Sequence, residues 1–153
     1  MSRLLPLALL AFAGCGAAGL DGSLTSVMDL SYDSVELRQT ADEVAVAFVR
    51  KNGDTALQVT AALKDLTLTA GQPVNLAEKL TATTQRGVLS RNVMGDSTTR
   101  FPSLERGTLT LGALPVAQGT VSGSFNATLV QGATEPYGRT ASGKFDAAVL
   151  QVP

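Results

Sequence analysis

Apolar and polar residues alternate with period two along most of the chain from Leu24 onward, and clusters of turn residues interrupt the alternation about every ten positions. This pattern is typical of short β-strands that bury one face. The clearest predicted pair flanks a turn at 51–54, where Asn-Gly tolerates the positive φ angles of a tight hairpin. The expected inward positions are Val44, Val46 and Phe48 before the turn, and Leu57, Val59, Ala61 and Leu63 after it.

Weaker patterns predict further elements. Leu66 and Leu68 alternate with threonines ahead of a turn at 70–73, and Leu109 and Leu111 indicate another strand. Asn75 can begin a short helix over 75–78, because its side chain can accept a hydrogen bond from a backbone N–H.

One motif occurs twice: T-x-S-G-x-F-x-A stands at 120–127 and again at 140–147. The turn residues at 135–138 between the two copies predict a hairpin. Pairing positions whose numbers sum to 270 places Phe125 opposite Phe145 and keeps both rings on the core face. The same register gives the pairs Ala127–Gly143 and Gly123–Ala147. We expect the glycines to make room for neighbouring aromatic rings.

The fold class that follows is all-β. The 17 threonines support it, because a β-branched hydroxyl residue suits the wet face of a sheet. With only 5% aromatic residues, Val, Leu and Ala must fill the interior, which favours an antiparallel β-sandwich with a thin core. A small β-barrel is the alternative, since both architectures show many short alternating strands.

The first fourteen residues have a different character. Arg3 supplies a positive charge, residues 4–12 are a continuous apolar run, and Ala13-Gly14 are small, which is the order of parts in a secretory signal peptide. A membrane-spanning helix needs roughly 20 apolar residues, so this run is too short to be one.

The four residues at the end of this segment, Phe12-Ala13-Gly14-Cys15, resemble the lipobox of bacterial lipoproteins. The resemblance implies cleavage before Cys15, the only cysteine of the chain, and attachment of lipid to it. The S-G-x-F-x-A motif is loosely similar to short β-rich bacterial lipoproteins. The alternative is an ordinary A-x-A cleavage site at 11–13, which would leave a soluble secreted protein with a free thiol.

On this interpretation residues 1–14 are a cleaved signal peptide, 15–23 a flexible tether rich in glycine and alanine, and 24–153 a single β domain. Two or more acyl chains hold a protein durably at a membrane. In enterobacterial lipoproteins, an Asp directly after the lipidated cysteine is a retention signal. Gly16 stands at that position here, so the resemblance favours export to the outer membrane.

The amino-acid composition argues against several classes of function. The absence of histidine excludes Ser-His-Asp and Cys-His catalysis, and we expect no enzyme, metal or cofactor. The formal net charge of −1 argues against binding nucleic acid. Asp29, Ser31 and Asp33 alternate and could share a calcium ion, but the glycine and distal acid of a calcium loop are missing, so exposed polar residues beside a turn are the simpler interpretation.

One charged segment stands out. The segment 86–106 contains only two acidic residues but four arginines, which are Arg86, Arg91, Arg100 and Arg106, and Phe101 lies among them. Irregular segments with arginine and an aromatic are common contact sites on β scaffolds, although solvated charges on strand edges are the plainer alternative. We therefore expect a non-enzymatic, membrane-anchored domain that contacts an envelope protein or polymer. The alternative function is a periplasmic carrier of a small apolar ligand.

Overall fold

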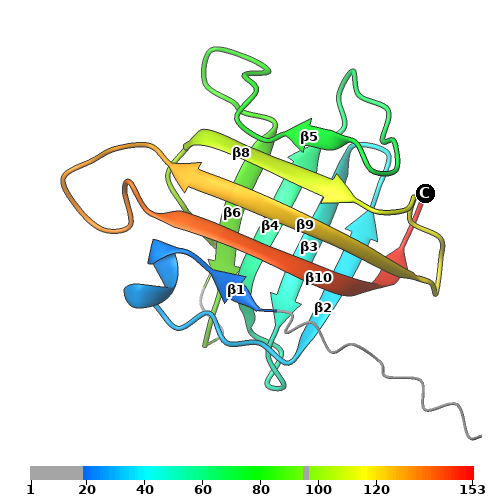
Figure 1. The fold of residues 1–153 in the computed structure, drawn as a ribbon, viewed down its shortest axis with the longest axis horizontal. Coiled ribbons are helices and arrows are strands. Elements are labelled where there is room, and N and C mark those ends of the chain that lie inside the picture. The colour runs from blue at the N-terminus through cyan, green and yellow to red at the C-terminus, as the bar shows by residue number, and fades with distance from the viewer. Residues whose placement is uncertain (1–18, 95–96) are drawn as a thin grey trace, which may run out of the picture.

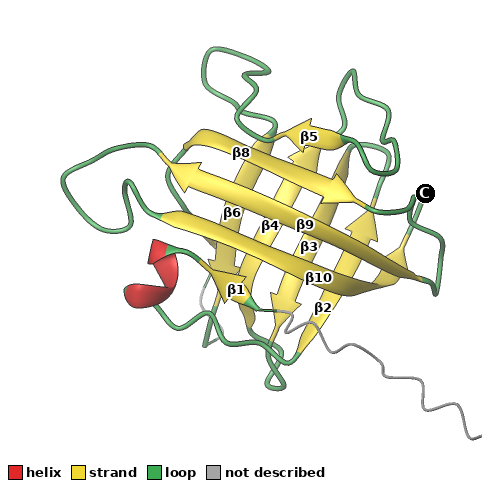
Figure 2. Cartoon of the chain, in the orientation of Figure 1, coloured by secondary structure: helices red, strands yellow, loops and turns green. Residues whose placement is uncertain are grey.

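The computed structural model describes residues 19–94 and 97–153, and within them the chain is almost entirely β-structure (Figures 1 and 2). The elements are β1 (Leu20–Asp21), the 3₁₀-helix η1 (Ser23–Ser26), β2 (Ser34–Gln39), β3 (Glu43–Val49), β4 (Thr55–Ala62), β5 (Pro73–Asn75), β6 (Gly87–Asn92), β7 (Thr99–Arg100), β8 (Leu104–Leu111), β9 (Thr120–Leu129) and β10 (Thr140–Gln151). The all-β class is confirmed. In this described part of the chain, no helix is long and apolar enough to cross a membrane.

The strands form one continuous, strongly curled sheet with the order β5-β8-β9-β10-β2-β3-β4-β6-β7, and β1 adds to β10. Figure 1 shows β8, β9 and β10 crossing in front of β2, β3, β4 and β6. β10 and β2 run parallel and join these two layers. The structure thus lies between the expected antiparallel sandwich and the alternative of a small barrel: it is a mixed half-barrel, because strands more than 100 residues apart pair side by side and continue one sheet round the corner.

The gap between β6 and β8 is bridged by the segment that follows β5. The N–H of Leu76 donates to the Gly107 carbonyl of β8 at 2.9 Å, and the Leu76 carbonyl accepts from Gly87 of β6 at 2.7 Å. The side chain of Gln85 adds two bonds to the backbone of Leu104, at 2.7 and 2.8 Å. A Cβ atom at Gly87 would lie 2.4 Å from the Leu76 Cβ, so this bridge requires glycine there.

The interior is filled by apolar side chains from both layers. The predicted inward residues Val44, Val46 and Phe48 are fully buried. The Phe48 ring lies at the centre, with centroids 5.7 Å from Phe125 and 6.2 Å from Phe145. The alternation predicted around the turn at 51–54 is confirmed as far as Ala61, since β3 and β4 pair as an antiparallel hairpin. Leu63 lies beyond the end of β4 and is only partly buried.

The β9–β10 hairpin forms, but the predicted register is wrong by two residues. Phe125 pairs with Gly143, and Phe145 pairs with Gly123, so the paired numbers sum to 268. Both rings still face the core, because a slip of two residues preserves the face. A Cβ atom at Gly123 would lie 2.5 Å from Cζ of Phe145, so each ring packs over a glycine and the expectation that glycine makes room for a ring is confirmed.

Two local predictions are also wrong. Leu66 and Leu68 lie in a loop and pack partly buried against the core instead of forming a strand. Asn75 does accept a hydrogen bond from the N–H of Ala77 at 3.0 Å, yet it ends β5 and caps no helix. The side-chain bond was predicted correctly, and the pairing of β5 with β8 decides the backbone conformation around it.

Part of the expected tether of residues 15–23 belongs to the fold. Leu20 and Asp21 pair with β10, and Leu20 packs against the core. Ser23 and Thr140 exchange hydrogen bonds, each backbone N–H donating to the other hydroxyl oxygen at 3.0 Å. Residues from Leu20 onward therefore belong to the fold, whereas Cys15 and the whole lipobox lie outside the described residues.

Candidate functional site

Arg86, the first arginine of the expected contact segment, is buried, with 4% of its surface exposed. Its Nε donates to Glu78 Oε2 at 2.7 Å, and its Nη1 donates to the carbonyls of Ala62 at 2.7 Å and Lys64 at 2.9 Å. The hydrogen bond from Arg86 lowers the pKa of the Glu78 carboxyl below its ordinary value. The hydrogen bonds of Arg86 thus connect the end of β4 to two loops, and this buried side chain cannot contact a partner.

Arg91 and Arg100 project to opposite faces of the sheet. Arg100 pairs with Ser90, the residue before Arg91 in β6. Antiparallel partners share a face and consecutive residues alternate, so Arg100 lies on the outer face and Arg91 on the core side. There the Nη1 of Arg91 donates to Met28 Sδ at 3.4 Å, a weak hydrogen bond.

Arg106 lies in the other layer, on β8. It is exposed, and its Nε donates to Thr128 Oγ1 on the neighbouring β9 at 3.2 Å. Phe101 is partly buried against the core, and its N–H donates to the Leu89 carbonyl at 2.9 Å. The structure therefore does not gather the four arginines and Phe101 on one surface.

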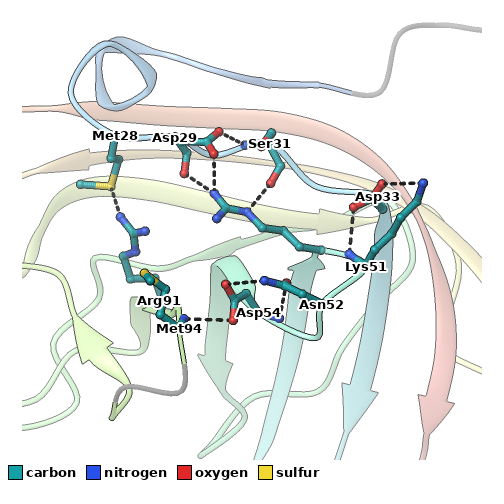
Figure 3. Close-up of polar contacts among 10 residues, drawn as sticks. Met28, Asp29, Ser31, Asp33, Lys51, Asn52, Asp54, Arg91 and Met94 are labelled. Atoms are coloured by element: carbon teal, nitrogen blue, oxygen red, sulfur yellow. Dashed lines mark hydrogen bonds and ion pairs between the residues drawn. The ribbon is translucent and has the colours of Figure 1, made fainter.

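A polar cluster surrounds the segment 27–33, called the strap below, which leads from η1 to β2 (Figure 3). The sequence indicated the strap residues of this cluster but not their partner Arg50. Arg50, at the end of β3, donates to the Asp29 carboxylate at 2.9 Å and to the Asp29 carbonyl at 2.8 Å. It also donates to the Ser31 carbonyl at 3.0 Å. The side chain of Arg50 is 19% exposed, so this arginine ties the strap to the adjoining hairpin.

Asp29 and Asp33, considered above for a calcium ion and interpreted as polar residues beside a turn, form hydrogen bonds within this cluster. Asp29 accepts from the Ser31 N–H, which is the main cause of its lowered pKa, and Arg50 and Arg91 lower that pKa further. Asp33 accepts from the backbone N–H of Lys51 at 2.9 Å. The described residues hold no group of three or more acids, histidines or cysteines placed to bind a metal ion.

Tyr32, at the end of the strap, has a buried hydroxyl that finds no hydrogen-bond partner among the described residues. Its ring meets Phe48 edge-on at 5.0 Å, and burial raises the pKa of its phenol. Apolar packing therefore holds this tyrosine in place.

An apolar hollow of about 570 Å³ lies beside the last residues of the chain, at the C-terminus that Figure 1 marks. Leu114 and Val116 contribute the most exposed apolar surface, 52% and 68% respectively. The remaining lining residues come from four separate parts of the chain: Gln39, Thr67, Leu68, Pro115, Ala117, Val152 and Pro153. Sequence patterning missed this hollow, because only the fold brings these parts together; the run Leu114-Pro115-Val116 was its one local signal.

Comparison of the chain with protein-family models, with curated proteins and with solved structures gave no match. Inferences about this protein therefore depend on its own residues and their arrangement.

Proposed function

We propose that this protein is a non-enzymatic, lipid-anchored domain of the bacterial cell envelope, with Cys15 as the lipidated residue, and that it binds another envelope protein through its outer surface. The observation that carries the binding role is the filled half-barrel. The central side chains Leu37, Val46, Phe48 and Leu57 have no exposed surface. A carrier of apolar ligands needs a continuous interior cavity of roughly 300 Å³ or more.

The apolar hollow around Leu114 and Val116 is the contact surface in this proposal. Large exposed apolar side chains favour the apolar side chains of a protein over a hydrated polymer. Leu114, Val116 and the neighbouring Leu68 come from two loops on a rigid sheet, and loops held by a scaffold are where binding surfaces concentrate.

The anchor is tested by labelling cells with a fatty-acid analogue. The wild type is expected to carry the label and Cys15→Ala to lose it. Label that persists in Cys15→Ala contradicts lipidation at this residue.

The contact surface is tested by crosslinking in native membranes with a tagged full-length chain. Leu114→Ser combined with Val116→Ser is expected to abolish a specific crosslink while leaving lipidation intact. Val27→Ser is the matched control, since Val27 is also an exposed apolar residue, at 39%, but lies beside η1. Equal crosslinking by the double variant and the control would rule out the hollow as the contact surface.

A further inference from the structure

Asparagine followed by glycine occurs once in the chain, as Asn52-Gly53 in the turn between β3 and β4. Both residues are exposed to water. Asparagine is a thermally labile residue, and a glycine after it leaves the next backbone nitrogen unshielded, because glycine has no Cβ. Each of the other asparagines, Asn75, Asn92 and Asn126, is followed by a residue with a side chain. The chemistry of the sequence therefore marks Asn52 as the asparagine most prone to lose its amide.

The folded hairpin holds both reacting groups by hydrogen bonds (Figure 3). The Nδ2 of Asn52 donates to Asp54 Oδ2 at 3.0 Å, and its Oδ1 accepts from the N–H of Asp54 at 3.1 Å. The N–H of Gly53 donates to the Arg50 carbonyl at 2.9 Å. Asp54 is partly buried and fixed in turn, since its Oδ1 accepts from the N–H of Met94 at 3.0 Å.

We propose that Asn52 is a site of spontaneous deamidation by solvent water, and that the folded hairpin protects it through Asp54. The reaction requires the Gly53 nitrogen to lose its proton and to attack Cγ of Asn52. In the folded chain that proton is bonded to the Arg50 carbonyl, and the two bonds to Asp54 fix the orientation of the amide. The modification therefore accumulates in chains whose hairpin has opened.

The covalent steps use water and no other reagent. The Gly53 nitrogen forms a bond to Cγ of Asn52, the bond from Cγ to Nδ2 breaks, and the amide leaves as ammonia with the proton of Gly53. The product is a cyclic imide between residues 52 and 53. Water then adds to one of its two carbonyls, the bond from that carbonyl to the Gly53 nitrogen breaks, and the nitrogen regains a proton. Addition at Cγ yields an aspartyl residue at 52, and addition at the backbone carbonyl yields an isoaspartyl residue.

Either product opposes closure of the hairpin. A carboxylate at 52 faces the Asp54 carboxylate in place of the amide that donates to it, and like charges at this distance repel. The isoaspartyl form also adds a carbon to the backbone ahead of Gly53, which displaces its N–H from the Arg50 carbonyl. The side chain of Arg50 ties the strap to this hairpin, so the change at 52 also loosens the strap.

The test incubates the full-length protein, purified in detergent, in mildly alkaline buffer, both folded and in urea. Deamidation at each asparagine is measured by peptide mass spectrometry. Asp54→Ala releases the Asn52 amide, and Asp33→Ala is the matched control. Asp33 accepts from the N–H of Lys51, the neighbour of Asn52, but among the described residues it bonds to neither Asn52 nor Gly53. Circular dichroism checks that each variant incubated without urea is folded.

In urea, Asn52 is expected to deamidate at least about tenfold faster than the other asparagines, and Gly53→Ala to slow it by a similar factor. In the folded wild type the reaction at Asn52 should be at least about tenfold slower than in urea. Asp54→Ala should recover most of the lost rate and Asp33→Ala none of it.

A reaction in urea without preference for Asn52 overturns the site, and equal rates in folded and urea-treated wild type overturn the protection. Equal rates in folded Asp54→Ala and Asp33→Ala overturn the role of Asp54. Where Asp54→Ala does not fold, Asp54→Asn takes its place, since it keeps the size of the side chain and one acceptor oxygen; a rate no faster than that of Asp33→Ala again overturns the role of Asp54. The proposal is independent of the lipid anchor, and all variants retain Cys15.

Discussion

Replacing Arg86 by Met should destabilise the fold strongly while leaving the outer surface unchanged. The substitution keeps an apolar stem of similar length but removes the guanidinium that serves Glu78 and the carbonyls of Ala62 and Lys64. The side chain of Arg86 is only 3% exposed, so water replaces these bonds poorly.

The magnitude follows from the groups left without a partner. The carbonyls of Ala62 and Lys64 lose a charged donor, whereas the Glu78 side chain is 49% exposed and is solvated when Arg86 is removed. Losing hydrogen bonds to a charged group costs about 1.5–3 kcal/mol. A domain of this size is expected to have a total stability of about 5–15 kcal/mol, and each kcal/mol shifts its Tm by roughly 4 °C. Arg86→Met should therefore lower Tm by roughly 6–12 °C.

The assay is urea and thermal unfolding followed by far-ultraviolet circular dichroism, since the chain has no tryptophan. Arg106→Met is the control, because Arg106 is exposed and, within the described residues, its side chain bonds only to Thr128; the effect of this substitution should stay within about 0.5 kcal/mol. A loss of less than about 1 kcal/mol in the free energy of unfolding of Arg86→Met would refute the stabilising role of the Arg86 hydrogen bonds.

The pH dependence of this bond has a definite sign. Arg86 lowers the folded-state pKa of Glu78 below the ordinary value of 4.5, so the stabilisation is present above that value and is lost as the pH falls through the lowered pKa. Arg86→Met should flatten this part of the acid limb of the stability curve.

Three further outcomes are expected. Gly123→Ala should lower the free energy of unfolding in urea far more than Gly143→Ala. A Cβ at Gly123 would lie 2.5 Å from the Phe145 ring, whereas a Cβ at Gly143 would lie 3.0 Å from its nearest neighbour, the side chain of Leu20. Equal losses would contradict the observed register. Tyr32→Phe should leave stability unchanged or raise it by about 1 kcal/mol, since it removes a buried hydroxyl for which no described residue is a partner, and a clear loss would show that the hydroxyl is bonded. Asp29→Asn should remove a stabilisation that depends on pH: in the wild type it is present above the ordinary pKa of 3.8 and is lost as the pH falls through the lowered pKa of Asp29. Acid titrations of the stability of both proteins check this, and identical acid limbs would argue against the contribution of Asp29.

The candidate sites show where local patterns stop being informative. Arg86 and Arg106 are indistinguishable as arginines in a polar segment, yet one is buried and the other exposed. Arg50 follows a clear strand and precedes a clear turn, but its three acceptors lie 19 to 21 residues away, in the strap. Such partners depend on how the strap crosses the hairpin, so no spacing along the chain predicts them.

The sequence by itself determined the class of fold, the hairpin on either side of residues 51–54 and the inward residues of β3, because the side chains of a strand alternate with period two. The same periodicity could not choose between registers that differ by two residues, since both bury Phe125 and Phe145. The tertiary structure decided that choice by packing each ring over a glycine of the other strand. It also decided the parallel pairing of β10 with β2, which turns two layers into one curled sheet, because contacts between the two ends of the chain leave no periodic signal in either.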